Sequence, residues 1–427
     1  MTDPALSSIV AALPDFDPGA LPVAVAQKAI ASCIRPLGGS ETIALDAALG
    51  RVLAADVVSP IDVPAHDNSA MDGYAFDGRA LSTAALTLRV AGCAHAGHPF
   101  DAMLDVGQCV RIMTGAVMPA GSDTVVPQEL VQTIGDTIAI PSGAVARGAN
   151  RRARGEDLAA GKAALNAGRI LRPADIGLLA SLGIAEVAVR PRLRVAFFST
   201  GDELRSLGEP LDDGCVYDSN RHTLRAMLLR LGCEPLDMGV VRDDPAALEA
   251  ALRFACDNAD AVLTSGGVSG GDADYTKQIV EKLGEIMFWK LAMRPGRPMA
   301  FGKLAANGSH AWLFGLPGNP VATMVAFYFF ARGALLQLMG ADEAPPPLLR
   351  AQSQSPIRKR PGRTEYQRGI LARGADGMPQ VRSTGAQGSG ILRSMSEANC
   401  MIVLGEERGS VEAGDLVDIV LFEGLTG

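Results

Sequence analysis

The stretch AVLTSGGVSGG, residues 261–271, joins a short apolar run to a glycine-rich loop. Residues 261–264 have the length and composition of a buried strand, and a helical pattern follows within residues 275–283. The amide groups of the loop would therefore be able to cradle a phosphate at the positive end of a helix. A tight turn that needs glycine explains the same residues, although the serines among the glycines favour an anion site.

Strands and helices alternate on both sides of this loop, through residues 194–339. Further strands are expected at residues 195–199, 236–241, 288–293 and 311–316. Further helices are expected at residues 220–231, within 245–258 and from Pro320 onward. This alternation predicts an open, mostly parallel α/β sheet that binds its ligands at the carboxyl ends of the strands.

A second strand-to-helix turn, residues 315–320, is predicted at the same edge of the sheet. Helix initiation by Pro320 explains this turn equally well when it is considered alone. Two such loops at one edge nevertheless favour a cleft between them.

Carboxylates follow three of the predicted strands, and they are Asp202, Glu203, Asp243, Asp244, Asp272 and Asp274. Carboxylates that converge at strand ends suit Mg²⁺, which takes a few protein oxygens together with substrate phosphate. Helix capping is the alternative for any one of them, most clearly for Asp244 ahead of Pro245. The repetition at three strand ends favours a metal site.

Positive charge at this edge comes from Lys290 and from the turn that contains Arg294 and Arg297. Guanidinium groups match oxyanions through paired hydrogen bonds. A solvated basic turn explains these residues equally well before their acidic surroundings are considered. Because the neighbouring carboxylates favour a metal site at this edge of the sheet, the arginine pair predicts a tetrahedral oxyanion as co-substrate.

Outside the α/β region, short β-type runs at residues 86–91 and 124–128 predict a separate small domain, and a proline run at residues 345–347 marks a linker. Helices are expected at residues 22–35 and 173–182. The predicted segments are residues 1–64 and 150–190 as two parts of a helical linker domain, 65–149 as an inserted small β-domain, 191–340 as the α/β catalytic domain, and 341–427 as a C-terminal β-barrel.

Composition narrows the class of protein further. The net charge of −8 gives no overall reason to expect nucleic acid as a partner. The seven cysteines are widely separated and form no C-x-x-C pair, so we expect reduced core residues. No secretory signal begins the chain, and the apolar run 321–331 ends at Arg332, short of the ~20 residues that span a membrane. A cytoplasmic protein without a membrane segment is expected.

Seven motifs, in order and at family spacing, resemble the molybdopterin molybdenumtransferase family, which includes MoeA and the gephyrin E-domain. They are residues 67–75, 111–116, 154–157, 199–204, 218–221, 265–269 and 315–320. The resemblance runs from about Pro22 to the end of the chain. Seven motifs in register are far more specific than a lone glycine-rich loop.

This resemblance implies a homodimer whose active site lies between the α/β domain of one subunit and the small β-domain of the other. It implies adenylated molybdopterin and molybdate as substrates, with AMP released by Mg²⁺-dependent hydrolysis. The catalytic residues that it implies are Asp72, Thr114, Asp157, Glu203, Asp243, Asp274 and Lys290, and the Mg²⁺ ligands are Glu203, Asp243 and Asp274. The substrate-binding residues are Ser265, Gly266, Gly267, Ser269, Pro317, Gly318, Asn319 and Pro320, and molybdate would be held by Arg294, Arg297, Arg368 and Ser389.

The chain departs from the family pattern at the oxyanion site. The family commonly has lysines at Arg294 and Arg297 and a serine at Ala322. Arginine keeps the charge but changes the hydrogen-bond geometry. A tungsten-inserting paralogue would use the same residues on tungstate.

A scaffold that binds partner proteins is an alternative from another class. The retained acidic residues and the lack of an appended adenylating domain or docking tail favour an enzyme. Its expected protein partners are a molybdopterin adenylyltransferase and chaperones of molybdoenzymes.

Overall fold

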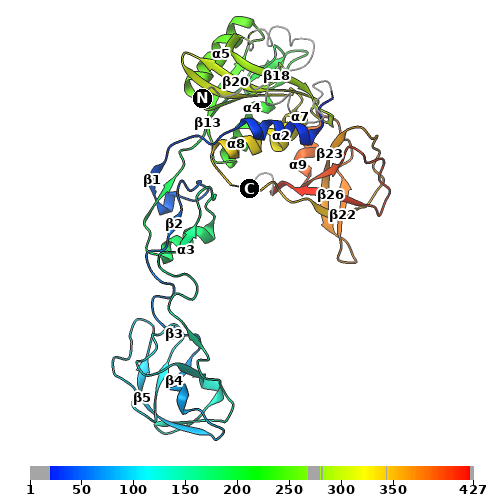
Figure 1. Ribbon diagram of the computed structural model, residues 1–427. Helices are drawn as coiled ribbons and strands as arrows, with labels where there is room; N and C mark the ends of the chain where they lie inside the picture. Colours follow the sequence, from blue (N-terminus) through cyan, green and yellow to red (C-terminus); the bar gives the residue numbers. More distant parts are fainter. Residues whose placement is uncertain (1–19, 268–278, 280–281, 343, 424–427) are drawn as a thin grey trace.

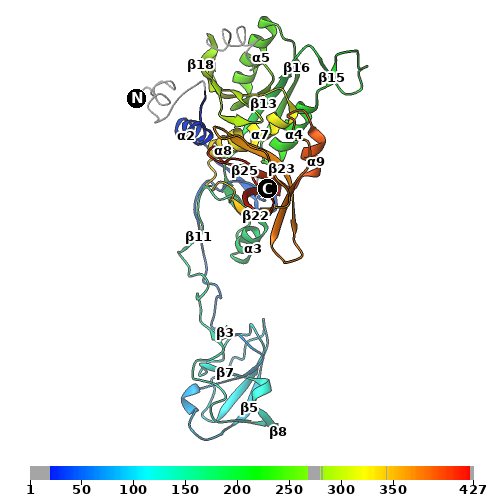
Figure 2. The same cartoon turned by 90° about the vertical axis from the view of Figure 1, so that its right-hand side faces the viewer.

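The computed structural model describes residues 20–267, 279, 282–342 and 344–423. The chain is elongated (Figure 1). An α/β domain and a β-barrel lie together at one end, a narrow linker follows, and a small β-domain forms the other end. The same separation is seen after a 90° turn (Figure 2).

The α/β domain is built on a six-stranded sheet in the order β16-β13-β17-β21-β20-β18. Four neighbouring strands are parallel, namely β13 (Arg194–Thr200), β16 (Glu234–Val241), β17 (Ala261–Ser265) and β21 (Ser309–Leu316). The remaining two strands are β20 (Pro298–Ala306) and β18 (Gly284–Lys290). Strand β20 pairs antiparallel with β21 on one side and with β18 on the other. Strand β17 is buried along its whole length, because helices cover both faces of a parallel sheet. The prediction of an open, mostly parallel sheet is confirmed.

The helices begin and end close to their predicted limits. Helix α4 (Ser219–Arg230) is capped by Asp218, and helix α5 (Pro245–Asn258) is capped by Asp244. The last helix runs through α7 (Pro320–Ala326), the π-helical turn η4 (Phe327–Ala331) and α8 (Arg332–Leu338).

That last helix corrects the expectation that Arg332 ends the apolar run. Arg332 is buried inside the helix, which continues to Leu338. By length and composition Pro320–Leu338 resembles a membrane span, but 78% of its apolar 18-residue window is buried within the protein. Helix α2 (Val23–Cys33) covers it, and Gln27 Nε2 donates to the Phe329 carbonyl at 2.8 Å. The helix is therefore part of the core of the α/β domain.

The C-terminal region is a β-barrel, as predicted. Its ring has the order β23-β24-β22-β26-β25 and closes through the pairing of β25 with β23. The strands are β22 (Leu349–Ser353), β23 (Thr364–Arg373), β24 (Pro379–Ser383), β25 (Cys400–Leu404) and β26 (Leu416–Leu421). A short strand of the α/β region, β19 (Met293–Arg294), pairs with β23 and thereby joins the two domains.

The small β-domain is an insertion, because the chain enters and leaves it along the same path. Three antiparallel two-stranded ladders pair the segment that enters the domain with the segment that leaves it. They are β1 (Glu41–Ala44) with β12 (Glu186–Val189), β2 (Val57–Val58) with β11 (Ala163–Leu165), and β3 (Asn68–Ser69) with β10 (Arg151–Arg152). Helix α3 (Pro173–Ser181) lies on the linker. The domain itself contains β4 (Gly73–Phe76), β5 (Leu86–Ala94), β6 (Gln108–Ile112), β7 (Thr124–Pro127), β8 (Gln132–Ile134) and β9 (Thr137–Ile140).

The cysteines are not all core residues, which corrects a further expectation. All seven are free, and five are buried. Cys93 is exposed because it lies on the outward face of β5, and Cys215 is partly exposed just before strand β15 (Val216–Tyr217).

Candidate active site

A cavity of about 950 Å³ lies at the carboxyl ends of the parallel strands. The turn after β17 contributes Gly266 and Gly267, and the loop after β21 contributes residues 317–320. The barrel closes another side with residues 387–390. The two predicted strand-to-helix loops therefore meet at one cavity.

The turn after β17 requires glycine. Gly266 has a φ of +94°, and a Cβ placed there would lie 2.6 Å from the Thr200 carbonyl oxygen. A Cβ on Gly318 would lie 3.6 Å from the Gly266 Cα, so the two loops are close neighbours. Their backbones can approach a ligand without intervening side chains.

The first turn of α4 holds these strand ends together. Asp218 Oδ1 accepts hydrogen bonds from Ser199 Oγ at 3.0 Å and from the Arg221 amide at 3.1 Å. Asn220 Nδ2 donates to Ser265 Oγ at 2.7 Å and to the Gly318 carbonyl at 2.6 Å. In the sequence, Asn220 is distinguished only by its place in the motif at residues 218–221.

Two of the predicted acidic ligands line the cavity, Glu203 and Asp243. The Glu203 carboxylate lies against Gly201, where an added Cβ would be 2.6 Å from its Oε2 atom. Asp244 instead accepts the Ala247 amide at 2.9 Å, so the capping alternative is confirmed for that residue.

Three residues selected from the sequence, Asp272, Asp274 and Ser269, lie outside the described residues. Within the described part of the chain, no group of three or more His, Cys, Asp or Glu residues is placed to hold a metal ion. Glu203 and Asp243 therefore form the described portion of the predicted Mg²⁺ site.

Arg294 and Arg297 line the cavity with their side chains exposed. Neither forms an ion pair with any carboxylate in the part of the chain that the structure describes. Arg363, which the sequence analysis did not select, also lines the cavity, but it pairs with Glu365 at 2.9 Å. Lys290 ends β18 opposite Pro298 and is not among the lining residues.

Arg368 is fully buried and also does not line the cavity. Its Nε donates to Ser394 Oγ at 2.9 Å, and its Nη2 donates to the Gly388 carbonyl at 2.9 Å. Burial and, to a smaller extent, the nearby charge of Arg294 together lower the pKa of Arg368 to about 10. Arg368 thus holds the loop that presents Ser389 to the cavity.

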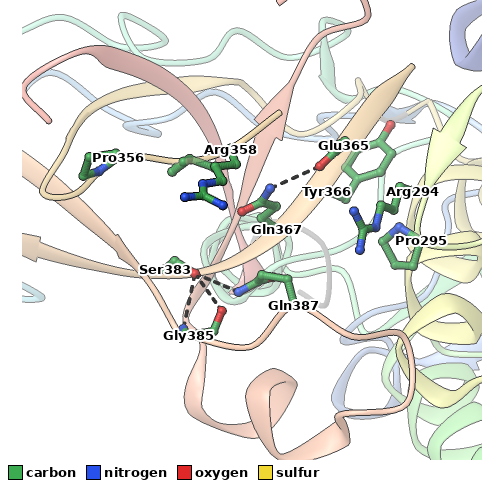
Figure 3. A pocket seen from close by; sticks show the side chains of 11 residues that line it. Arg294, Pro295, Pro356, Arg358, Glu365, Tyr366, Gln367, Ser383, Gly385 and Gln387 are labelled. Atoms are coloured by element: carbon green, nitrogen blue, oxygen red, sulfur yellow. Dashed lines mark hydrogen bonds between the residues drawn. The ribbon is translucent and has the colours of Figure 1, made fainter. Parts of the chain in front are cut away.

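A second pocket of about 280 Å³ adjoins the cavity and shares Arg294, Pro295 and Gln387 with it. Figure 3 shows Gln367 between Arg358 and Arg294. Gln387 is fixed by donating to Ser383 Oγ at 2.9 Å. The polar surface around Arg294 therefore extends into the barrel.

Three predicted catalytic residues lie far from this cavity within one chain. Asp72 and Thr114 belong to the inserted β-domain, at the opposite end of the molecule (Figure 1). Asp72 Oδ1 accepts both the Thr114 amide and its Oγ1, each at 2.7 Å, and these bonds hold the pKa of Asp72 below its usual range. Asp157 is exposed on the linker.

Most of the chain matches known protein families. Three family models match consecutive parts of the chain: the MoeA N-terminal region (domain I and II) at residues 21–183, a probable molybdopterin binding domain at 196–337, and the MoeA C-terminal region (domain IV) at 350–422. The chain is a member of the MoeA family.

Relatives within the MoeA family match over most of their length. A molybdopterin molybdenumtransferase of Haemophilus influenzae is 44% identical over 389 residues, covering 91% of this chain and 95% of the relative. The corresponding protein of a Nostoc species is 38% identical, covering 86% and 85%. The crystal structure of a molybdopterin biosynthesis moeA protein from Pyrococcus horikoshii superposes with a TM-score of 0.81 at 29% identity, covering 94% of this chain and all of that one. This MoeA-family chain is accordingly a transferase.

Proposed function

We propose that the chain transfers molybdenum from molybdate to adenylated molybdopterin, and that hydrolysis of the adenylate releases AMP. The observation that supports this most directly is the mixed charge of one cavity. Among the described residues Arg294 and Arg297 form no ion pair, and they line the same cavity as the carboxylates Glu203 and Asp243. A substrate with phosphate groups and a separate metal oxyanion needs both kinds of group.

The glycine loops suit the phosphate part of the pterin substrate. Gly266 and Gly318 leave their backbones bare at the cavity wall. Backbone amides in such a position donate to phosphate oxygens without the entropy loss of a long side chain. The arginines then remain available for molybdate, whose tetrahedral oxygens fit the guanidinium fork.

The carboxylates fit a hard divalent cation, because they present oxygen ligands at adjacent strand ends beside a phosphate-binding loop. Glu203, Asp243 and Asp274 would hold Mg²⁺, which would neutralise charge on the phosphate bond that is hydrolysed. The chain's own contribution is to place Glu203 and Asp243 in the same cavity as Arg294 and Arg297.

A homodimer completes the site in this proposal. The inserted β-domain, which carries Asp72 and Thr114, lies at the far end of the chain from the α/β domain that carries the cavity (Figure 2), and Asp157 lies on the linker between them. A two-fold partner with the same elongated shape would bring its β-domain to the cavity. We propose that the protein works in the cytoplasm, receives its pterin from an adenylyltransferase and delivers its product to chaperones of molybdoenzymes.

The direct test incubates the purified protein with adenylated molybdopterin, Mg²⁺ and either molybdate or tungstate. AMP release and molybdenum-containing cofactor are measured in the same samples. The proposal expects both products with molybdate, and loss of AMP release when Mg²⁺ is chelated. A tungstate preference would reassign the chain as a tungsten-inserting paralogue, and absence of AMP release with either oxyanion would overturn the proposal.

A further inference from the structure

We infer that Asn220 is a positioning residue for the substrate, because it sets the distance between the two loops that form the cavity wall. The inference rests on the proposed function. Asn220 lies in the first turn of α4, and its amide group forms hydrogen bonds to Ser265 and Gly318 at the same time. Ser265 ends β17, and Gly318 follows β21.

The neighbouring residue Asp218 extends this link to a third strand. Its side chain accepts the hydroxyl of Ser199, which lies near the end of β13. Strands β13, β17 and β21 are adjacent in the sheet. The first turn of one helix thus connects three consecutive strand ends, all on the side where the cavity opens.

Asp218 and Asn220 are buried, which protects their hydrogen bonds to the strand ends from water. The exposed fractions of Asp218 and Asn220 are 2% and 9%, although both residues contribute to the cavity wall. Water therefore does not replace the hydrogen bonds easily, and the two loops are held at one separation. A ligand that bridges the loops meets a wall that is already in place.

Two oxygens of this turn remain without a donor. Asp218 Oδ2 and Asn220 Oδ1 are buried and form no hydrogen bond in the described structure. Unsatisfied buried acceptors lower stability, so a turn that served stability alone would not retain them. Their presence beside the cavity supports a role in binding rather than in folding.

Substitution by aspartate separates the two bonds of Asn220. The carboxylate has the same shape, and the Ser265 hydroxyl can turn to donate to it. The Gly318 carbonyl has no proton to donate, so that contact becomes repulsive. Asn220→Asp should therefore release the loop after β21 while leaving the β17 turn attached, and Ser265→Ala should do the reverse.

The experiment measures KM and kcat for adenylated molybdopterin, direct binding of that substrate, and the free energy of unfolding. We expect Asn220→Asp to raise KM and the dissociation constant about tenfold, as for loss of one hydrogen bond to a fixed group, with kcat reduced much less. The matched control is Thr223→Val, one helical turn further along α4. The Thr223 hydroxyl donates to the Ser219 carbonyl at 3.0 Å and to no other group among the described residues. Its KM should equal that of the wild type.

Ser265→Ala keeps the inference testable if Asn220→Asp does not fold. A variant that is less stable but retains the wild-type KM would show a purely structural role and would overturn the inference. Wild-type protein that neither binds adenylated molybdopterin nor releases AMP would instead overturn the proposed function, because no variant is involved in that comparison.

Discussion

Charge at the cavity depends on a few side chains whose surroundings differ sharply. Arg297 is exposed and unpaired in the described structure, whereas Arg363 is tied to Glu365 and Arg368 is buried beneath the loop. Only an unpaired guanidinium can exchange water for an incoming oxyanion without first breaking an ion pair. We therefore propose that molybdate is captured chiefly by Arg294 and Arg297.

Replacing Arg297 by alanine should raise the molybdate concentration for half-maximal insertion by about 10- to 100-fold, the usual effect of losing a charged hydrogen-bond partner. Arg297→Lys should recover part of this loss, because the charge returns without the planar fork. Arg225→Ala, at an exposed position on α4, is the control. Unchanged molybdate dependence together with weaker pterin binding would place this arginine at the substrate phosphate.

The Asp72–Thr114 contact gives a prediction about pH. Thr114→Ala removes the Oγ1 donor but keeps the amide donor, so the pKa of Asp72 should rise toward its usual value. Asp72 then gains its proton at higher pH, and the acid limb of activity should move to higher pH. Carbon-13 NMR titration of the carboxyl group measures the shift. An acid limb that does not move would separate Asp72 from the rate-limiting ionisation.

The buried position of Arg368 could not be predicted from the sequence. From the sequence alone, an arginine within a polar run is expected to bind a ligand, whether its guanidinium faces the cavity or the loop behind it. Its bonds to the carbonyls of residues 386–388 depend on the fold of a segment almost twenty residues away. The role of Asn220 could not be predicted for the same reason, because its hydrogen-bond partners are separated from it by 45 and 98 residues in the sequence.

Among the secondary-structure elements, those with strong local patterns were predictable. Strand β17 begins with an apolar run and ends at Ser265, just before two glycines, and helices α4 and α5 carry aspartate caps. Strand β20 was not predicted, because its register depends on its neighbours β18 and β21. The predicted strand at 288–293 is divided in the structure between β18 and β19, which belong to different sheets.

The turn after β17 yields a stability prediction. Gly266→Ala places a Cβ against the Thr200 carbonyl at a φ of +94°, and such strain costs about 1–3 kcal/mol of unfolding free energy. Substrate affinity should fall with it. Gly333→Ala is the control, because this helical glycine has nothing within 4 Å of an added Cβ and should gain about 0.5–1 kcal/mol. Chemical denaturation measures both, and equal stability of the two variants would contradict the strain argument.

The elongated shape separates two sets of residues that the proposed reaction needs together. The cavity with Glu203 lies at one end of the chain, and the Asp72–Thr114 pair lies in the inserted domain at the other (Figure 1). The three ladders of the linker fix this separation, because each ties the outgoing chain to the returning one. Nothing in the local sequence pattern predicts such a distance. We propose that a composite site between two subunits brings the two sets together.

Complementation between two inactive chains tests this composite site most directly. Differently tagged Asp72→Ala and Glu203→Ala chains are combined, the heterodimer is purified, and AMP release from adenylated molybdopterin is measured. One of its two sites then contains neither substitution, so we predict about half of the wild-type turnover, with both mutant homodimers inactive. Heterodimers as inactive as the two homodimers would contradict an active site shared between subunits.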